Sequence, residues 1–261
     1  MKRLRTMLLA LVVLLLSLGL LLWFLPARWV QSSLEARLHG LRLDELGGTL
    51  WNGHAGRLLT ADGRDLGTLE WHLSHAALWG DTRFSVAVDG PRLSFHGDMH
   101  QLDAQRVEWN QLHLQGDIDS LGNHAMVWGS MLRGQVNIDI AHVLLQGRWP
   151  LELDGKARWS EAAVGTSKGV LALGEIQLQA QGQEGVIQGQ LRDGGSGPLQ
   201  LDGQLGLSPL GWRYSVNAKP RGGNPALQTW LQGLGRADAD GSVHIKGSGG
   251  LVKAAGDKGK P

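Results

Sequence analysis

The sequence predicts a mainly β protein with a single N-terminal transmembrane helix, a long antiparallel sheet and one short late helix. Three observations predict this fold class. An apolar run, Met7–Leu25, follows a basic N-terminus, and after it apolar residues recur at every second position over most of the chain. The 39 glycines separate these alternating segments instead of gathering in one stretch. A period of two is typical of strands with one apolar face, and glycines placed in this way are typical of turns and bulges.

The run Met7–Leu25 predicts one membrane crossing. A helix that rises 1.5 Å per residue covers about 28 Å over this run, which is close to the thickness of the hydrocarbon core. Lys2, Arg3 and Arg5 precede the run. Because basic residues stay on the cytoplasmic side, residues 1–6 are expected in the cytoplasm and the rest of the chain on the other side.

A cleaved secretory signal is the alternative for this run. Such a signal has a shorter apolar core, about 7–15 residues, followed by small residues at the cleavage site. Here bulky residues follow, and Trp23 and Trp29 suit the membrane interface. We therefore expect an uncleaved signal anchor over residues 7–25.

Residues 26–40 are expected to form a juxtamembrane amphipathic helix. Val30, Leu34 and Leu38 share one helical face, and Pro26 separates this segment from the membrane helix. The pattern fits a helix that leads away from the bilayer and equally one that lies on its surface.

Residues 41–246 are expected to form the β domain. Within it Leu-x-Leu-x-Gly recurs at Leu112–Gly116, Leu151–Gly155 and Leu199–Gly203, which indicates hairpins built alike. The apolar sheet face must meet a second sheet, as in a sandwich, or line the trough of a sheet folded lengthwise into a U shape. Both remain open from the sequence. The residues expected to line such a trough are Leu69, Trp71, Phe84, Val86, Leu93 and Phe95.

One helix is predicted late in the chain, over Asn224–Gly233. Asn224 is suited to the N-cap and Pro225 to the first helical position, and Leu227 and Leu231 lie on one face. Residues 247–261 are rich in Gly, Lys and Ala and are expected to be a disordered tail.

Composition excludes several functions. The chain has no cysteine, so it offers no disulfide, no cysteine metal site and no thiol nucleophile. Its formal net charge is +1 and its basic residues are scattered, which argues against a nucleic-acid partner.

No catalytic constellation is expected. Gly165–Gly169 matches G-x-S-x-G around Ser167, but the next residues have the pattern of a strand where a nucleophile elbow requires a helix. His72 and His75 would point to opposite faces of a strand and could not share a metal ion. We expect no enzyme activity, no metal and no cofactor.

Several motifs resemble those of a known family. The segments Gly48–Ala55 and Gly67–Trp71, and later Asn224–Gln228, Leu234–Arg236 and Asp238–Gly241, are similar in order and distance to type II secretion system protein N. The resemblance implies a single-pass inner-membrane protein with a periplasmic domain, which supports export of folded proteins by contacting other subunits of the apparatus. Its motif residues are Gly48, Thr49, Leu50, Trp51, Asn52, Gly53, Asn224 and Pro225, all taken as structural.

A second likeness gives an alternative function. The Gly48–Trp51 start also resembles that of large bacterial envelope proteins with a lengthwise-folded sheet, which are implicated in lipid transport. This likeness implies a lipid-binding β trough. On either alternative we expect Gly48 and Gly53 to bracket a short strand, with Thr49 and Trp51 on one side, Leu50 on the other, and Trp51 filling one end of the sheet.

Overall fold

A computed structural model describes residues 11, 13, 14, 16, 17, 19, 21, 23–31, 35, 40–118, 126, 127, 130–166 and 169–250. Within these residues, no helix combines the length and the apolar character needed to cross a bilayer. Parts of the predicted transmembrane helix (7–25) and juxtamembrane helix (26–40), and all of residues 1–6, lie outside the described residues.

The chain divides into two compact units, Met1–Pro91 and Arg92–Pro261. The predicted β domain, residues 41–246, therefore contains parts of both units. The predicted tail was expected to begin at Gly247, but the last strand continues to Gly250; residues 251–261 lie outside the described part.

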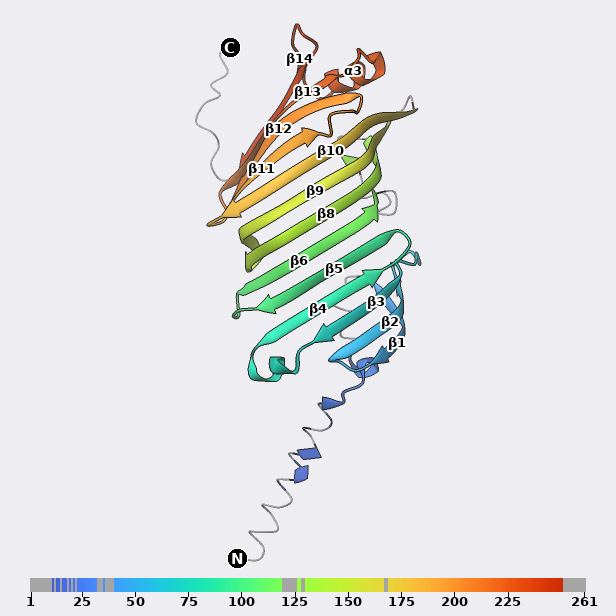
Figure 1. Ribbon diagram of the computed structural model, residues 1–261, viewed down its shortest axis with the longest axis vertical. Helices are drawn as coiled ribbons and strands as arrows, with labels where there is room; N and C mark the ends of the chain where they lie inside the picture. The colour runs from blue at the N-terminus through green and yellow to red at the C-terminus, as the bar shows by residue number, and fades with distance from the viewer. Residues whose placement is uncertain are drawn as a thin grey trace, which may run out of the picture. The chain divides into compact units, whose positions relative to one another are not determined.

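The first unit carries a four-stranded antiparallel meander, in which each strand pairs with the next along the chain (Figure 1). The elements of the first unit are η1 (Ala27–Val30), β1 (Arg42–Gly48), β2 (Asn52–Leu59), β3 (Thr68–Leu73), η2 (His75–Trp79) and β4 (Thr82–Asp89). The short 3-10 helix η1 lies where the amphipathic helix was predicted to begin.

The second unit is one antiparallel sheet in the order β5-β6-β8-β9-β10-β11-β12-β13-β15-β14, with β7 paired to β8 (Figure 1). The elements are β5 (Leu93–Gln101), β6 (Arg106–Asp117), β7 (Met126–Val127), β8 (Ser130–Gln146), β9 (Trp149–Thr166), β10 (Gly169–Gln183), β11 (Val186–Asp193), β12 (Leu199–Ser208), β13 (Gly211–Pro220), α3 (Pro225–Gln232), β14 (Arg236–Ala237) and β15 (Val243–Gly250).

The predicted late helix is confirmed as α3. The Asn224 side chain accepts hydrogen bonds from the backbone N–H groups of Ala226 and Leu227, which satisfies donors that a helix N-terminus leaves free. Leu227 and Leu231 are 0% and 1% exposed. They pack with buried residues of the sheet, and this contact forms the core of the unit. The sheet residues are Ala162, Val164, Leu173, Leu199, Leu201, Ala218, Val243 and Ile245.

Asp193 joins the β11–β12 turn to the segment that leads into α3. Its Oδ2 accepts hydrogen bonds from Arg221 Nη2 at 2.7 Å and Gly195 N at 3.0 Å, and its Oδ1 accepts one from Leu201 N at 2.9 Å. Burial acts to raise the pKa of Asp193, but these hydrogen bonds and the Arg221 charge outweigh it and hold the pKa below its usual 3.8.

We predict that Asp193→Asn lowers the free energy of unfolding by about 1–3 kcal/mol at neutral pH, because Arg221 loses its charged partner. A lowered pKa stabilises the fold above the usual value of 3.8, and this contribution disappears as the pH falls through the folded-state pKa. Urea denaturation should therefore show the two proteins converging below that pH. Asp202→Asn is the control, because its exposed carboxylate lies 4.0 Å from Arg192. A loss that is equal at every pH would contradict the prediction.

Candidate functional site

The second unit presents one continuous apolar face, formed by residues in direct register across its strands. Ala157 in β9 pairs with Ile138 in β8 and with Leu178 in β10, and Leu178 pairs with Leu191 in β11. Residues directly opposite each other in an antiparallel sheet share a face. The apolar face comprises Leu112, Leu114, Ile138, Ile140, Ala157, Trp159, Ile176, Leu178, Ala180, Leu191, Leu201, Leu205, Tyr214 and Val216, together with the residues beneath α3.

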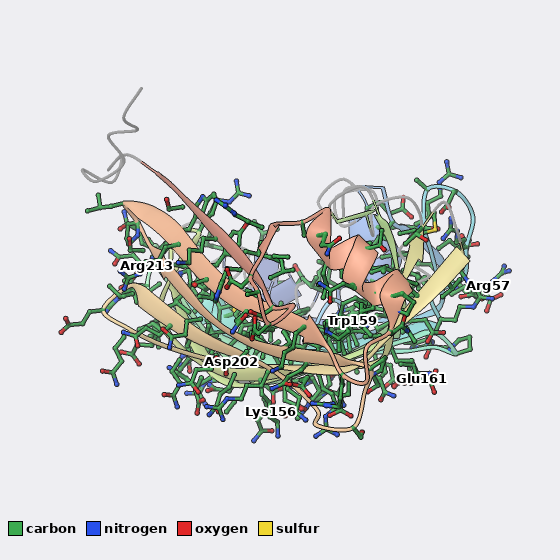
Figure 2. The ribbon with its side chains drawn as sticks, turned by 90° about the horizontal axis from the view of Figure 1, so that it is seen from above. Arg57, Lys156, Trp159, Glu161, Asp202 and Arg213 are labelled. Atoms are coloured by element: carbon green, nitrogen blue, oxygen red, sulfur yellow. The ribbon has the colours of Figure 1, made fainter. Side chains whose placement is uncertain are left out.

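The alternate residues of the same strands form a polar face. Lys156 and Arg158 flank Ala157 in β9, and Gln177 and Gln179 flank Leu178 in β10; all four are exposed. Figure 2 shows Trp159 on the side of the sheet that carries α3 and Lys156 on the opposite side. Because successive side chains of a strand point to opposite faces, this single sheet has apolar residues on one face and polar residues on the other.

A cluster of buried residues lies on the apolar face beneath α3. Elsewhere on this face single residues such as Val143 and Ile187 are buried, while many of their neighbours stay partly exposed. Leu199 and Val243, near α3, are 2% and 0% exposed, whereas Ala157, Leu178 and Leu191 are half-buried. All strands described in this unit belong to one sheet, so the sandwich alternative is wrong for it. The open sheet face is the candidate functional site.

The repeated Leu-x-Leu-x-Gly segments place their glycines on this face. A Cβ added to Gly155 would lie 3.1 Å from Ile140 Cγ1, and one added to Gly203 would lie 2.9 Å from Val216 Cγ2. A branched side chain of the neighbouring strand thus lies over each glycine. These segments are alike because the glycine leaves room for a side chain of a neighbouring strand.

A hollow of about 1140 Å³ is lined mainly by the polar face. Gln179, Gln181, Gln190, Gln204 and Arg213 are among the residues that line it. Amides of this kind can form hydrogen bonds with many groups and do not select one ligand chemistry.

The Gly48–Gly53 motif forms a hairpin turn in the first unit, so the prediction of a short strand bracketed by its glycines is wrong. Gly48 ends β1 with φ 79°, which favours glycine. Thr49 N donates to Asn52 O at 2.8 Å and Thr49 Oγ1 accepts from Asn52 N at 3.1 Å. These bonds hold Thr49, Leu50 and Trp51 in the turn and not on the two faces of a strand.

Trp51 is 4% exposed and ties this turn to the rest of the unit. Its ring stacks on His75 with a centroid distance of 4.5 Å, and Trp23 stacks on His75 at 4.1 Å. Trp71 Nε1 also donates to Leu50 O at 3.0 Å. The burial of Trp51 is what a structural role requires; the role itself stays a prediction.

The six predicted trough residues fall in two sets. In the first unit Trp71 of β3 pairs with Val86 of β4. Leu69 lies two residues before Trp71 and Phe84 two residues before Val86, so all four side chains share one face. In the second unit Phe95 pairs with Leu114, and Leu93 lies two residues before Phe95 on the same face of β5. All six are half-buried. The prediction missed the longer row from β8 to β13, although the same alternation is present there.

The other predicted positions do not come together. His72 contacts Asn52, while His75 lies in the aromatic stack, so these two histidines do not converge. Ser167 lies outside the described residues. Asp238 pairs with His244 at 3.0 Å, and Asp238–Gly241 forms the turn before β15.

The fold and the site define a single-sheet β protein with an open apolar face. The family model for type II secretion system (T2SS), protein N matches residues 39–246, and the chain therefore belongs to this family of type II secretion components. It is 28% identical over 246 residues to the type II secretion system protein N of Aeromonas hydrophila, covering 89% of this chain and 93% of that relative. No solved structure matches the chain significantly.

We predict that Trp51→Ala lowers the free energy of unfolding by about 3–5 kcal/mol, because it removes a buried ring from the stack on His75. Trp79→Ala is the matched control, since Trp79 is 77% exposed in η2, and its effect should be small. Thermal denaturation of both variants tests this. An unchanged melting temperature for Trp51→Ala, combined with a loss of secretion, would assign Trp51 to partner contact instead.

Proposed function

We propose that this protein is an inner-membrane-anchored, periplasm-facing accessory subunit of the type II secretion system. It supports export of folded proteins across the outer membrane by binding other subunits and catalyses no reaction itself. Membership of the protein N family supports the assignment to type II secretion. The open apolar face of the second unit is the observation that supports action by binding. An apolar sheet face of this extent is typical of an interaction surface.

The anchor rests on the run Met7–Leu25 and the basic residues before it. The residues described between positions 11 and 23 are helical. Their large apolar side chains are exposed, with Leu14 at 62% and Leu16 at 68%. Exposed apolar side chains around a helix fit contact with lipid.

The partners are other inner-membrane or periplasmic subunits of the same apparatus. Half-buried residues such as Leu178 and Leu191 remain in partial contact with water. Covering them with a partner would remove apolar area from water, which stabilises a complex by about 25 cal/mol per Å² before the costs of association.

Lipid binding is the second candidate function. The observation that favours it is the continuity of the apolar face from β6 to β13, with polar side chains confined to the other side of the sheet. Such a face could shield acyl chains from water while the polar face remains solvated.

One experiment separates the two candidates. Deletion of the gene should lower release of exoproteins into the medium and raise their periplasmic pools. Complementation with the normal gene or with Gln179→Asp, on the polar face, should restore release, whereas Leu178→Asp should not, because it places a charge on the apolar face. Limited proteolysis checks that each variant is folded, and Leu178→Gln provides a milder change.

The outcomes are distinct. Unaltered secretion in the deletion strain, together with a loss of outer-membrane lipid asymmetry, would contradict the first candidate and support lipid binding. Full restoration by folded Leu178→Asp would show that the apolar face is not where the protein acts.

A further inference from the structure

The outer edge of β1 is covered by side chains of the segment before it. Gln31 Nε2 donates to Leu43 O at 3.0 Å, and Glu35 Oε1 accepts from Leu43 N at 3.2 Å. Arg28 Nε donates to Leu46 O at 3.2 Å. Because these groups occupy the free backbone donor and acceptors, this edge is protected against pairing with another strand.

The outer edge of β15 has no such cover among the described residues. β13 pairs with β15 along its length, whereas β14 reaches only Val243 and His244. Asp238 N donates to Ser242 O, so the backbone groups of Ser242 point away from β13. Since this direction alternates along a strand, those of Lys246, Ser248 and Gly250 point outward as well.

Two aromatic rings lie beside this edge on the apolar face. A Cβ on Gly247 would lie 2.5 Å from Tyr214 Cε1, and one on Gly249 would lie 2.9 Å from Trp212 Nε1. The rings therefore extend over the glycines of β15. They stack at 5.7 Å, and Trp212 is 44% exposed. A strand added outside β15 would find aromatic surface next to its own side chains.

The polar face of the same edge is basic. Lys246 stands opposite Ser215, and Arg213 stands opposite Ser248. Both charged residues are exposed, and Figure 2 shows Arg213 at the end of the sheet away from α3. Each positive charge thus faces a neutral residue of the neighbouring strand, which leaves it available to a carboxylate.

We propose that the outer edge of β15 binds an extended segment of another protein by strand addition. The segment places apolar residues beside Trp212 and Tyr214 and alternates them with acidic residues beside Lys246 and Arg213. Backbone hydrogen bonds supply affinity in this mode, and the alternating side chains supply selectivity. The inference deepens the proposed function and rests on it for the partner's identity as a secretion subunit.

A second copy of this chain is a poorer occupant. Antiparallel pairing of two β15 edges would bring two copies each of Lys246 and Arg213 to one face without adding a carboxylate from either strand. Like charges that face each other across paired strands destabilise the pairing. The charge at the edge therefore favours an acidic partner.

The test uses the full-length protein in detergent micelles and two short fluorescein-labelled peptides. In one, valine alternates with glutamate, and in the other, valine alternates with lysine. We expect saturable anisotropy with the glutamate peptide and binding at least about tenfold weaker with the lysine peptide. Amide hydrogen exchange at Lys246 and Ser248 should slow when the glutamate peptide binds. Equal binding of both peptides, no binding, or unchanged exchange would overturn the proposal.

Substitutions test the edge directly. Lys246→Pro removes an outward N–H and should abolish binding, and an edge strand tolerates proline where its N–H faces solvent. Lys246→Glu should weaken binding of the glutamate peptide, while Lys156→Glu, the same charge change on β9, should not. If Lys246→Pro melts at lower temperature, Lys246→Glu and the exchange data still decide the question.

Two further outcomes are informative. A concentration-dependent dimer that Lys246→Pro disrupts would overturn the proposal in favour of a second copy. Peptide binding that follows the expected pattern, with normal secretion by Lys246→Pro cells, would leave the edge site standing and contradict its link to the proposed function.

Discussion

The architecture of the second unit depends on a single layer of strands that has one apolar face and one short helix to cover it. Burying a leucine side chain is worth about 1.5–3 kcal/mol. Leu227 and Leu231 of α3 gain this stabilisation in full, at 0% and 1% exposure, whereas the half-buried Leu178 and Leu191 gain only part of it. The buried cluster therefore gathers at the α3 end, and outside it buried residues such as Val143 and Ile187 alternate with half-buried ones.

The limited cover of the sheet also explains where side-chain hydrogen bonds and ion pairs are found. Asp193 and Arg221 fasten the segment that carries α3, the element on which the core depends. Arg28, Gln31 and Glu35 protect the edge of β1 in the first unit. Among the described residues, the outer edge of β15 beyond His244 has no such cover, and two aromatic rings lie beside it. Open apolar surface and an open edge are both features of a protein that works through contacts.

Features that depend on residues close together in the sequence were predicted correctly. Alternation predicted the strands, and Asn224 with Pro225 predicted α3, because capping and periodicity act within a few residues. The Gly48–Gly53 turn was missed, since glycines at both ends fit a strand or a turn equally. The stack on His75 and the choice of an open sheet over a sandwich depend on residues distant in sequence. Gly247–Gly250 resembled a tail because the rings that cover its glycines come from β13.

The open apolar face is tested most directly by cysteine labelling, because the chain contains no cysteine of its own. Single cysteines at Ala180 on the apolar face, Gln179 on the polar face and Ala218 beneath α3 would be reacted with a maleimide fluorophore in nanodisc-held full-length protein. The account predicts that Ala180→Cys reacts readily, like Gln179→Cys, with blue-shifted emission. Protection of Ala180→Cys equal to that of Ala218→Cys would show that the face is covered and would contradict the account.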